Sequence, residues 1–138
     1  LMTEGGSLIT LTYEGSTRVM PSYNVMGVAK AALEASVRYL AADLGPQGVR
    51  VNAISPGPMR TLAGAVIGSA RYVYRVSREA SPLRRNIELS DVGGAALYYL
   101  SDLSAGVTGT VHYVDAGYHA VGMPPQGAGE ANGEQGGE

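Results

Sequence analysis

Residues 22–55 read SYNVMGVAKAALEASVRYLAADLGPQGVRVNAIS, and this stretch decides the fold class because it joins a helix to a strand. Apolar residues recur through its first part at helical steps of seven, four, three and four: Met26, Leu33, Val37, Leu40 and Leu44. Ser22 is the expected N-cap of this helix, and Gly45-Pro46 is expected to end it. Residues 49–55 (VRVNAIS) are short and rich in branched apolar side chains, which predicts a buried strand.

Short apolar segments also lie on both sides of this unit. Residues 7–12 (SLITLT) and 111–115 (VHYVD) are predicted to be two more strands. Residues 61–80 favour a loose helix, and Ser90 is expected to cap a helix that runs to about Ser101. The resulting order, β–α–β–α–α–β, predicts an α/β fold in which helices cover the faces of a parallel sheet.

Three strands make up only about half of a doubly wound dinucleotide-binding sheet, which has two βαβαβ halves. No G-x-G-x-x-G turn follows a first strand. We therefore expect residues 1–123 to be the C-terminal half of a Rossmann-like domain whose N-terminal nucleotide-binding half is absent. The chain starts at Leu1, which also suggests a fragment. Residues 124–138 contain almost no apolar side chains and are predicted to be a disordered tail.

The composition excludes several classes of function. A net charge of −2 gives no electrostatic reason to expect binding to nucleic acid or to an anionic membrane. No apolar run approaches the roughly 20 residues that span a bilayer. The chain has no cysteine, which rules out disulfides and a thiol nucleophile and fits a cytoplasmic location. His112 and His119 lack partners at metal-binding spacing, so we expect no metal site.

Tyr23 and Lys30 are candidates for a chemical role. They are seven positions apart, which on a helix places both on one face about 10 Å apart along the axis. A helical lysine leans toward the N-terminus, so Lys30 could reach the space in front of Tyr23, where a pair of sugar hydroxyls would fit. The spacing alone leaves a structural alternative, in which Lys30 reaches past an apolar stripe to solvent and Tyr23 packs near the helix start.

A second tyrosine, Tyr13, extends the pair to the pattern Y-x9-Y-x6-K. Within the 22–55 stretch, this pattern resembles the enoyl-acyl-carrier-protein reductases of bacterial fatty-acid synthesis, a divergent branch of the short-chain dehydrogenase/reductase superfamily. The ordinary branch of that superfamily has Y-x3-K instead. Here Gly27 stands where that lysine would be, so the ordinary pattern fails while the enoyl-reductase pattern holds.

The resemblance extends along residues 1 to about 123. It includes GPMRTLA at 57–63 and LSDLSAGVTGTVHYVDAGY at 100–118, which matches the last helix and strand of the family. One departure is Pro56, which gives SPGP where the enoyl-reductase branch is expected to have SAGP. Proline lacks an N–H donor, so this substitution is expected to change the geometry of the loop slightly.

The resemblance implies reduction of a trans-2-enoyl thioester, bound to acyl carrier protein, by hydride from NADH. Tyr23, by its position in the pattern, is the implied donor to the thioester oxygen, where negative charge develops. Lys30 is implied to hold the hydroxyls of the nicotinamide ribose, and its charge is expected to favour a polarised phenol. Tyr13 follows the end of a predicted strand, which is the sheet edge that binds ligands, and would line the site near the thioester.

Further contacts are implied by the same resemblance. The nicotinamide carboxamide would meet the segment after the 49–55 strand, made of Met59, Arg60, Thr61, Leu62 and Ala63. Residues 64–80 would form a mobile lid over the acyl chain, and Met26 and Ile67 would line the substrate site. The implied assembly is a homotetramer built through the helix that starts at Tyr23 and through the last strand.

Two other functions stay open on the sequence. Pro56-Gly57 is typical of the ordinary branch and favours a short-chain dehydrogenase that acts on a ketone or an alcohol. The missing glycine-rich turn favours a non-catalytic fragment, or an interaction module that dimerises through its long helix and last strand. Arg84-Arg85 fits a solvated turn, with contact to the acidic carrier protein as the alternative.

Overall fold

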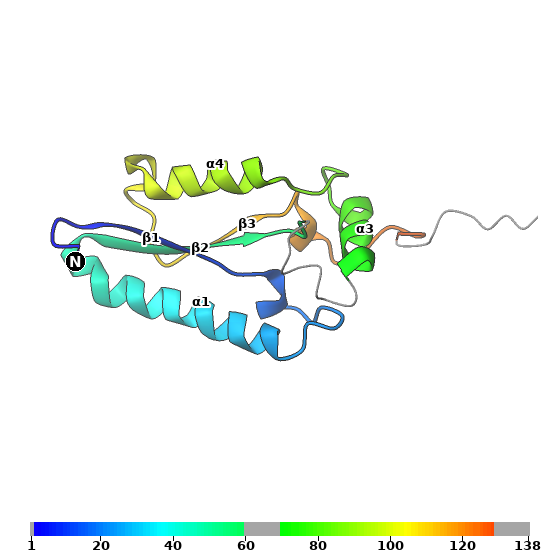
Figure 1. The fold of residues 1–138 in the computed structure, drawn as a ribbon, viewed down its shortest axis with the longest axis horizontal. Helices are drawn as coiled ribbons and strands as arrows, with labels where there is room; N and C mark the ends of the chain where they lie inside the picture. Colours follow the sequence, from blue (N-terminus) through cyan, green and yellow to red (C-terminus); the bar gives the residue numbers. More distant parts are fainter. Residues whose placement is uncertain (1, 60–69, 129–138) are drawn as a thin grey trace, which may run out of the picture.

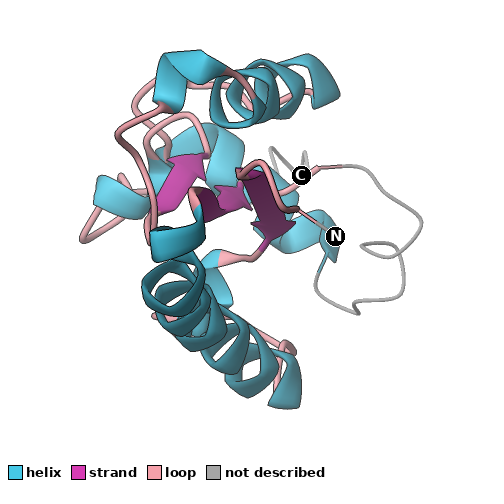
Figure 2. Ribbon diagram, turned by 90° about the vertical axis from the view of Figure 1, so that its left-hand side faces the viewer, coloured by secondary structure: helices cyan, strands magenta, loops and turns pink. Residues whose placement is uncertain are grey.

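The computed structural model describes residues 2–59 and 70–128, and it confirms the predicted α/β fold. The strands β1 (Gly6–Leu11), β2 (Val49–Pro56) and β3 (Val111–Val114) form a parallel sheet in the order β1-β2-β3. The described helices are α1 (Val25–Leu44), α3 (Ala70–Ala80) and α4 (Leu89–Leu100). Helix α1 covers one face of the sheet and α4 the other, while α3 lies beyond the carboxyl ends of the strands (Figure 1). Figure 2 shows the strands between the same two helical layers.

Strand β2 is the centre of the core, as its run of apolar residues predicts. It pairs with β1 from Gly6↔Val49 to Leu11↔Ile54, and with β3 from Ala53↔Val111 onward. Alternate side chains of a strand point to opposite faces, so β2 supplies both layers of the core. The cluster on the α1 side consists of Val37, Ala41, Val49, Val51 and Ala53. The cluster on the α4 side consists of Ile54, Ile87, Val92, Tyr99 and Ala116.

Two polar residues of β2 fasten the turn that joins α4 to β3. Arg50 donates to the carbonyls of Tyr99 (3.0 Å) and Ser101 (3.1 Å) and to Ser104 Oγ (2.7 Å). Asn52 is fully buried and donates through Nδ2 to the carbonyl of Val107 at 3.0 Å. The bonds to Tyr99 and Ser101 reach carbonyl groups at the end of α4, and the bond to Val107 holds the turn that leads to β3.

Both predicted N-caps are wrong. Helix α1 begins at Val25, because Ser22 (φ 60°) and Asn24 (φ 50°) have left-handed backbone that interrupts a helix before that point. Helix α4 begins at Leu89 after Glu88, whose side chain and that of Asp91 form a reciprocal capping box. The predicted helix over 61–80 is confirmed for Ala70–Ala80, and the rest of it lies outside the described residues.

The apolar stripe predicted on α1 is only partly correct. Val37 is buried as predicted, but Met26 and Leu40 are 47% and 43% exposed, and the other buried positions of the helix are Glu34 and Ala41. The sheet meets α1 along this narrower stripe, so the apolar side chains beside it stay on the surface. The division at residue 123 and the disordered tail stay predictions, since residues 129–138 lie outside the described part. Within the described part, no helix is long and apolar enough to cross a membrane.

Candidate active site

The carboxyl ends of the parallel strands meet at one edge of the sheet, where α/β folds bind ligands. Tyr13 follows β1, Gly57 follows β2, and Asp115 follows β3. A Cβ atom at Gly57 would lie 3.0 Å from Asp115 Cα. The segments that follow β2 and β3 therefore lie so close together that only glycine fits at position 57. Tyr13 therefore lies at this edge of the sheet, and its role in the site stays a prediction.

Tyr13 and Tyr23 are in direct contact. Their ring centroids are 5.0 Å apart and their planes 62° apart, an edge-to-face arrangement. Two glycines make room for this contact. A Cβ atom at Gly15 would collide with the Tyr23 ring, and one at Gly27 would lie 2.7 Å from the carbonyl oxygen of Gly15. Position 27 therefore has no space for the side chain that a Y-x3-K pattern would place there.

Lys30 is anchored at the end of β1. Its Nζ donates to the carbonyl oxygen of Leu11 at 2.8 Å, two residues before Tyr13. Among the described residues Lys30 forms no salt bridge. The prediction that Tyr23 and Lys30 lie on one helix is wrong, because Tyr23 is in the turn before α1. That turn folds the Tyr23 ring back onto Tyr13, so both tyrosines and the lysine still gather around the end of β1.

Both phenols hold their protons at neutral pH. Burial raises the pKa of Tyr13 well above its usual range, and the nearby Glu14 carboxylate raises it further. Burial also raises the pKa of Tyr23, so the polarising effect expected from Lys30 does not outweigh desolvation. A protonated phenol is a hydrogen-bond donor, which suits either ring to an oxygen atom that gains negative charge.

Three charged residues of this region were not predicted from the sequence. Glu34 of α1 is buried and accepts hydrogen bonds from Thr12 Oγ1 (2.6 Å) and Ser16 Oγ (2.5 Å), on either side of the Tyr13 segment. Glu14 and Arg18 follow Tyr13 and form an ion pair at 3.1 Å. A glutamate four residues after Lys30 looks like a surface residue, so periodicity gave no signal for its burial.

Comparison with known proteins identifies the family. The family model described as Enoyl-(Acyl carrier protein) reductase matches residues 1–119, which is most of the chain. The chain belongs to this reductase family. The enoyl-[acyl-carrier-protein] reductase [NADH] 2 of Rhizobium meliloti is 67% identical over 124 residues, which cover 90% of this chain and 46% of that protein. The reductase [NADH] FabI of Rickettsia bellii is 57% identical over 122 residues, covering 88% of this chain and 47% of the relative.

Solved structures of reductases have the same fold. The enzyme from Anaplasma phagocytophilum, crystallised in complex with NAD, is 62% identical with a TM-score of 0.86, over 91% of this chain and 48% of that chain. The Aquifex aeolicus enzyme is 44% identical with a TM-score of 0.83, over 86% of this chain and 46% of that one. The chain thus spans about half the length of the relatives it matches. These matches confirm the predicted resemblance and the interpretation as about half of a Rossmann-like domain.

The reductase segment after β2 is described only in part. Pro56 ends β2 opposite Val114, and the Gly57 N–H donates to the Val114 carbonyl at 2.8 Å, so the proline does not interrupt the ladder. Met59 packs beside the core cluster on the α4 side. The remaining predicted contacts lie outside the described residues: Arg60, Thr61, Leu62, Ala63 and Ile67.

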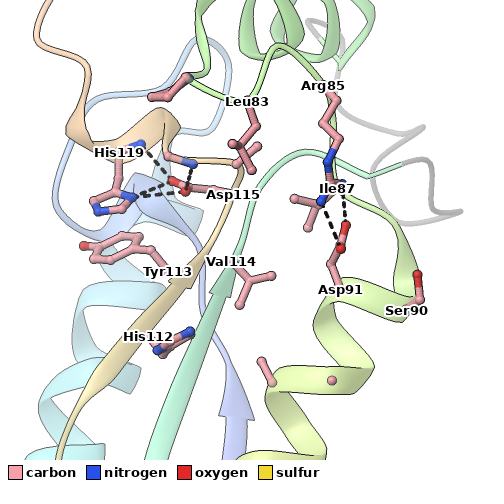
Figure 3. A pocket seen from close by; sticks show the side chains of 15 residues that line it. Leu83, Arg85, Ile87, Ser90, Asp91, His112, Tyr113, Val114, Asp115 and His119 are labelled. Carbon is pink, nitrogen blue, oxygen red and sulfur yellow. Dashed lines mark hydrogen bonds and ion pairs between the residues drawn. The ribbon is translucent and has the colours of Figure 1, made fainter.

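An open pocket of about 750 Å³ lies elsewhere in this reductase fragment, between β3, α4 and the turn before α4 (Figure 3). Two polar pairs line it: Asp115 with His119, 3.0 Å apart, and Arg85 with Asp91, 2.6 Å apart. Tyr13, Tyr23 and Lys30 are not among its lining residues. The alternative role of Arg84-Arg85, contact with the acidic carrier protein, stays a prediction. The described residues contain no group of three or more side chains that could hold a metal ion.

Proposed function

We propose that the protein containing this chain reduces trans-2-enoyl thioesters of acyl carrier protein with NADH. The observation that carries the proposal is the contact of Tyr13 with Tyr23 beside Lys30, at the carboxyl edge of a parallel sheet, in a chain of this family. The relatives named above are NADH-dependent reductases of acyl-carrier-protein substrates, which supports this cofactor and this substrate class. The chain carries the tyrosines and the lysine, and a further half-domain like that of the relatives would complete the dinucleotide site.

The lysine fits a role in holding the cofactor. An ammonium group has three N–H donors, and the Leu11 carbonyl takes one of those of Lys30. Among the described residues no acceptor takes the other two, which would donate to the two hydroxyls of the nicotinamide ribose. Met59 and the predicted contacts after it, Arg60 to Ala63, would hold the nicotinamide carboxamide. Bound NADH supplies a hydride to the β-carbon of the enoyl thioester.

The tyrosines act on the substrate. As the β-carbon gains hydride, negative charge moves to the thioester oxygen, and the Tyr23 hydroxyl donates a hydrogen bond to it. Protonation of the α-carbon then collapses this enolate and completes the reduction. This bond is stronger in the transition state than in the ground state, so it speeds the reaction rather than only tightening binding. Tyr13, in contact with Tyr23, lines the thioester site together with Met26 and Ile67. Residues 64–80, whose last part is α3, would cover the acyl chain.

Substitution of Tyr23 tests this function. Tyr23→Phe keeps the ring contact and removes the donor, so kcat for reduction of an enoyl thioester should fall about 100-fold or more. The assay follows NADH absorbance in the whole natural protein that contains this chain. Tyr98→Phe is the matched control, because Tyr98 is a partly exposed tyrosine of α4 on the opposite face of the sheet. Equal rates for the two variants would rule out the proposed role of Tyr23.

Pro56-Gly57 supports a second candidate, a short-chain dehydrogenase acting on ketones or alcohols. The two functions differ in the bond that is reduced, C=C or C=O. The same protein is therefore offered matched enoyl and 3-ketoacyl thioesters. Faster reduction of the ketone would replace the first proposal by the second.

We also propose that the complete protein is a cytoplasmic homotetramer. Several apolar side chains on the outer side of α1 are exposed, which supports helix contact with another copy. They are Val25, Val28, Tyr39 and Leu40. The mass in solution, measured by light scattering, tests this assembly, and a monomer at micromolar concentration would contradict it.

A further inference from the structure

Glu14 is a charged residue buried beside the proposed site. It is 5% exposed, and burial raises its pKa, while Arg18 lowers it. Its Oε1 has no hydrogen-bond partner among the described residues, although it lies 3.1 Å from Nη1 of Arg18. The two charges are therefore paired by attraction without a directed bond, which leaves the guanidinium N–H groups free to bind elsewhere.

Arg18 uses those N–H groups on a segment more than 100 residues away. Its Nη1 donates to the carbonyl oxygen of Val121 at 3.3 Å, and its Nη2 to that of His119 at 2.5 Å. The planar fork of an arginine can make such contacts at the same time, which a lysine cannot match. One side chain thus joins the loop after β1 to the turn after β3.

The turn that receives Arg18 is itself held in place. The Asp115 carboxylate accepts the backbone N–H groups of Gly117 (2.9 Å) and His119 (2.7 Å). The His119 ring stacks on Tyr113 with a centroid distance of 4.2 Å and lies 3.0 Å from Asp115 Oδ2, as Figure 3 shows. The carbonyl groups of this turn therefore have a fixed direction, so they form a rigid anchor for the guanidinium.

We propose that Arg18 is a positioning residue that fastens the Tyr13 loop to the turn after β3. Glu34 holds the same loop from the α1 side through Thr12 and Ser16, so Arg18 supplies the opposite attachment. Between these two attachments Tyr13 is kept against Tyr23. The inference rests on the proposed function for the role of Tyr13, whereas the attachment itself does not depend on that function.

Amide hydrogen exchange tests the attachment without any assay of activity. Arg18→Gln removes the charge and the fork, and it is compared with Arg38→Gln, which removes an exposed arginine from α1. The amides to follow are hydrogen-bonded on both sides of the attachment: Ser16 and Thr17, and Ala120 and Val121. Arg18→Gln should speed exchange at both pairs of amides, since each segment loses its support from the other. Arg38→Gln should change neither.

Kinetics test what the attachment does for catalysis. In the whole natural protein, Arg18→Gln should lower kcat/KM for an enoyl thioester roughly tenfold to a hundredfold, because a misplaced side chain loses its alignment with substrate. The same substitution in a Tyr13→Ala background should cost much less, because the ring that Arg18 positions is no longer there. A purely structural role would give the same loss in both backgrounds.

The two experiments distinguish a wrong proposed function from a wrong attachment. If the parent protein reduces no enoyl thioester, the proposed function is wrong, and hydrogen exchange still decides whether Arg18 joins the two segments. If exchange in Arg18→Gln equals that in Arg38→Gln, the attachment is wrong whatever the activity. Faster exchange with equal kinetic losses in both backgrounds would overturn the positioning role.

Discussion

At the scale of single residues, close contact with a neighbouring backbone accounts for glycine at position 27, although alanine is the better helix former. Alanine favours a helix over glycine by about 1 kcal/mol, but a Cβ here would lie 2.7 Å from the Gly15 carbonyl oxygen. We expect Gly27→Ala to lower the free energy of unfolding by about 1–3 kcal/mol, since backbone must shift to admit the methyl group. Gly93→Ala on α4 is the matched control, because a Cβ there meets nothing within 4 Å. Urea unfolding in which both substitutions stabilise the chain would contradict this.

Glu14 makes the stability of the folded chain depend on pH, and the direction of that dependence can be predicted. Burial raises its pKa in the folded chain, against the opposing effect of Arg18. The folded state then binds a proton more readily than the unfolded state, so this residue lowers stability as pH rises from the ordinary glutamate pKa through the raised one. Charged groups of the turn after β3, Asp115 and His119, act on it as well.

The test of this prediction compares the unfolding free energies of a Glu14 variant and the parent across pH. The unfolding free energy of Glu14→Gln minus that of the parent should increase from acid to neutral pH, because glutamine does not titrate. Glu4→Gln, an exposed glutamate before β1, is the control and should give a difference that does not increase in this range. A difference for Glu14→Gln that falls as pH rises would show that the ion pair with Arg18 outweighs burial.

At the scale of elements, helix and strand interiors could be predicted from the sequence, but helix starts could not. Strand β2 and the body of α1 follow from their apolar patterns. The start of α1 depends on left-handed backbone at Ser22 and Asn24, which no periodicity encodes. The burial of Glu34 depends on hydroxyls of a loop about 20 residues away in sequence. The spacing of Tyr13, Tyr23 and Lys30 was informative because family resemblance, rather than helix geometry, gave it meaning.

The start of α4 carries a prediction of its own. Asp91 accepts a hydrogen bond from Arg85 and also the Glu88 N–H, and these contacts lower its pKa to about 2. A lowered pKa stabilises the folded chain above the ordinary aspartate pKa, and that contribution is lost as pH falls toward 2. Asp91→Asn should therefore be less stable than the parent at neutral pH and approach it in acid. Asp102→Asn, at an exposed position after α4, is the control, and identical pH profiles of the two variants would contradict the assignment.

At the scale of the whole molecule, the sheet itself indicates that the chain works as part of a larger unit. Strand β1 pairs with β2 on one side, and Leu8 and Leu11 are 39% and 50% exposed at this edge of the described sheet. Parallel sheets are stable when both faces are covered and the strand edges are paired. The relatives are about twice as long, so a further half-domain that adds a parallel strand to β1 would bury these side chains.

This arrangement predicts how cofactor affinity is divided between the two halves. The sequence contains no G-x-G-x-x-G motif of the kind that cradles a pyrophosphate, so Lys30 and the segment after β2 would contact only the nicotinamide end. We expect calorimetry to show no tight NADH binding by the 138 residues alone. Fusing the N-terminal half of the Rhizobium meliloti reductase to them should restore binding, and Lys30→Ala should weaken it again while Arg38→Ala should not. Micromolar affinity of the 138 residues alone would mean that this half holds the whole dinucleotide, by contacts that the parallel edge of β1, β2 and β3 does not suggest.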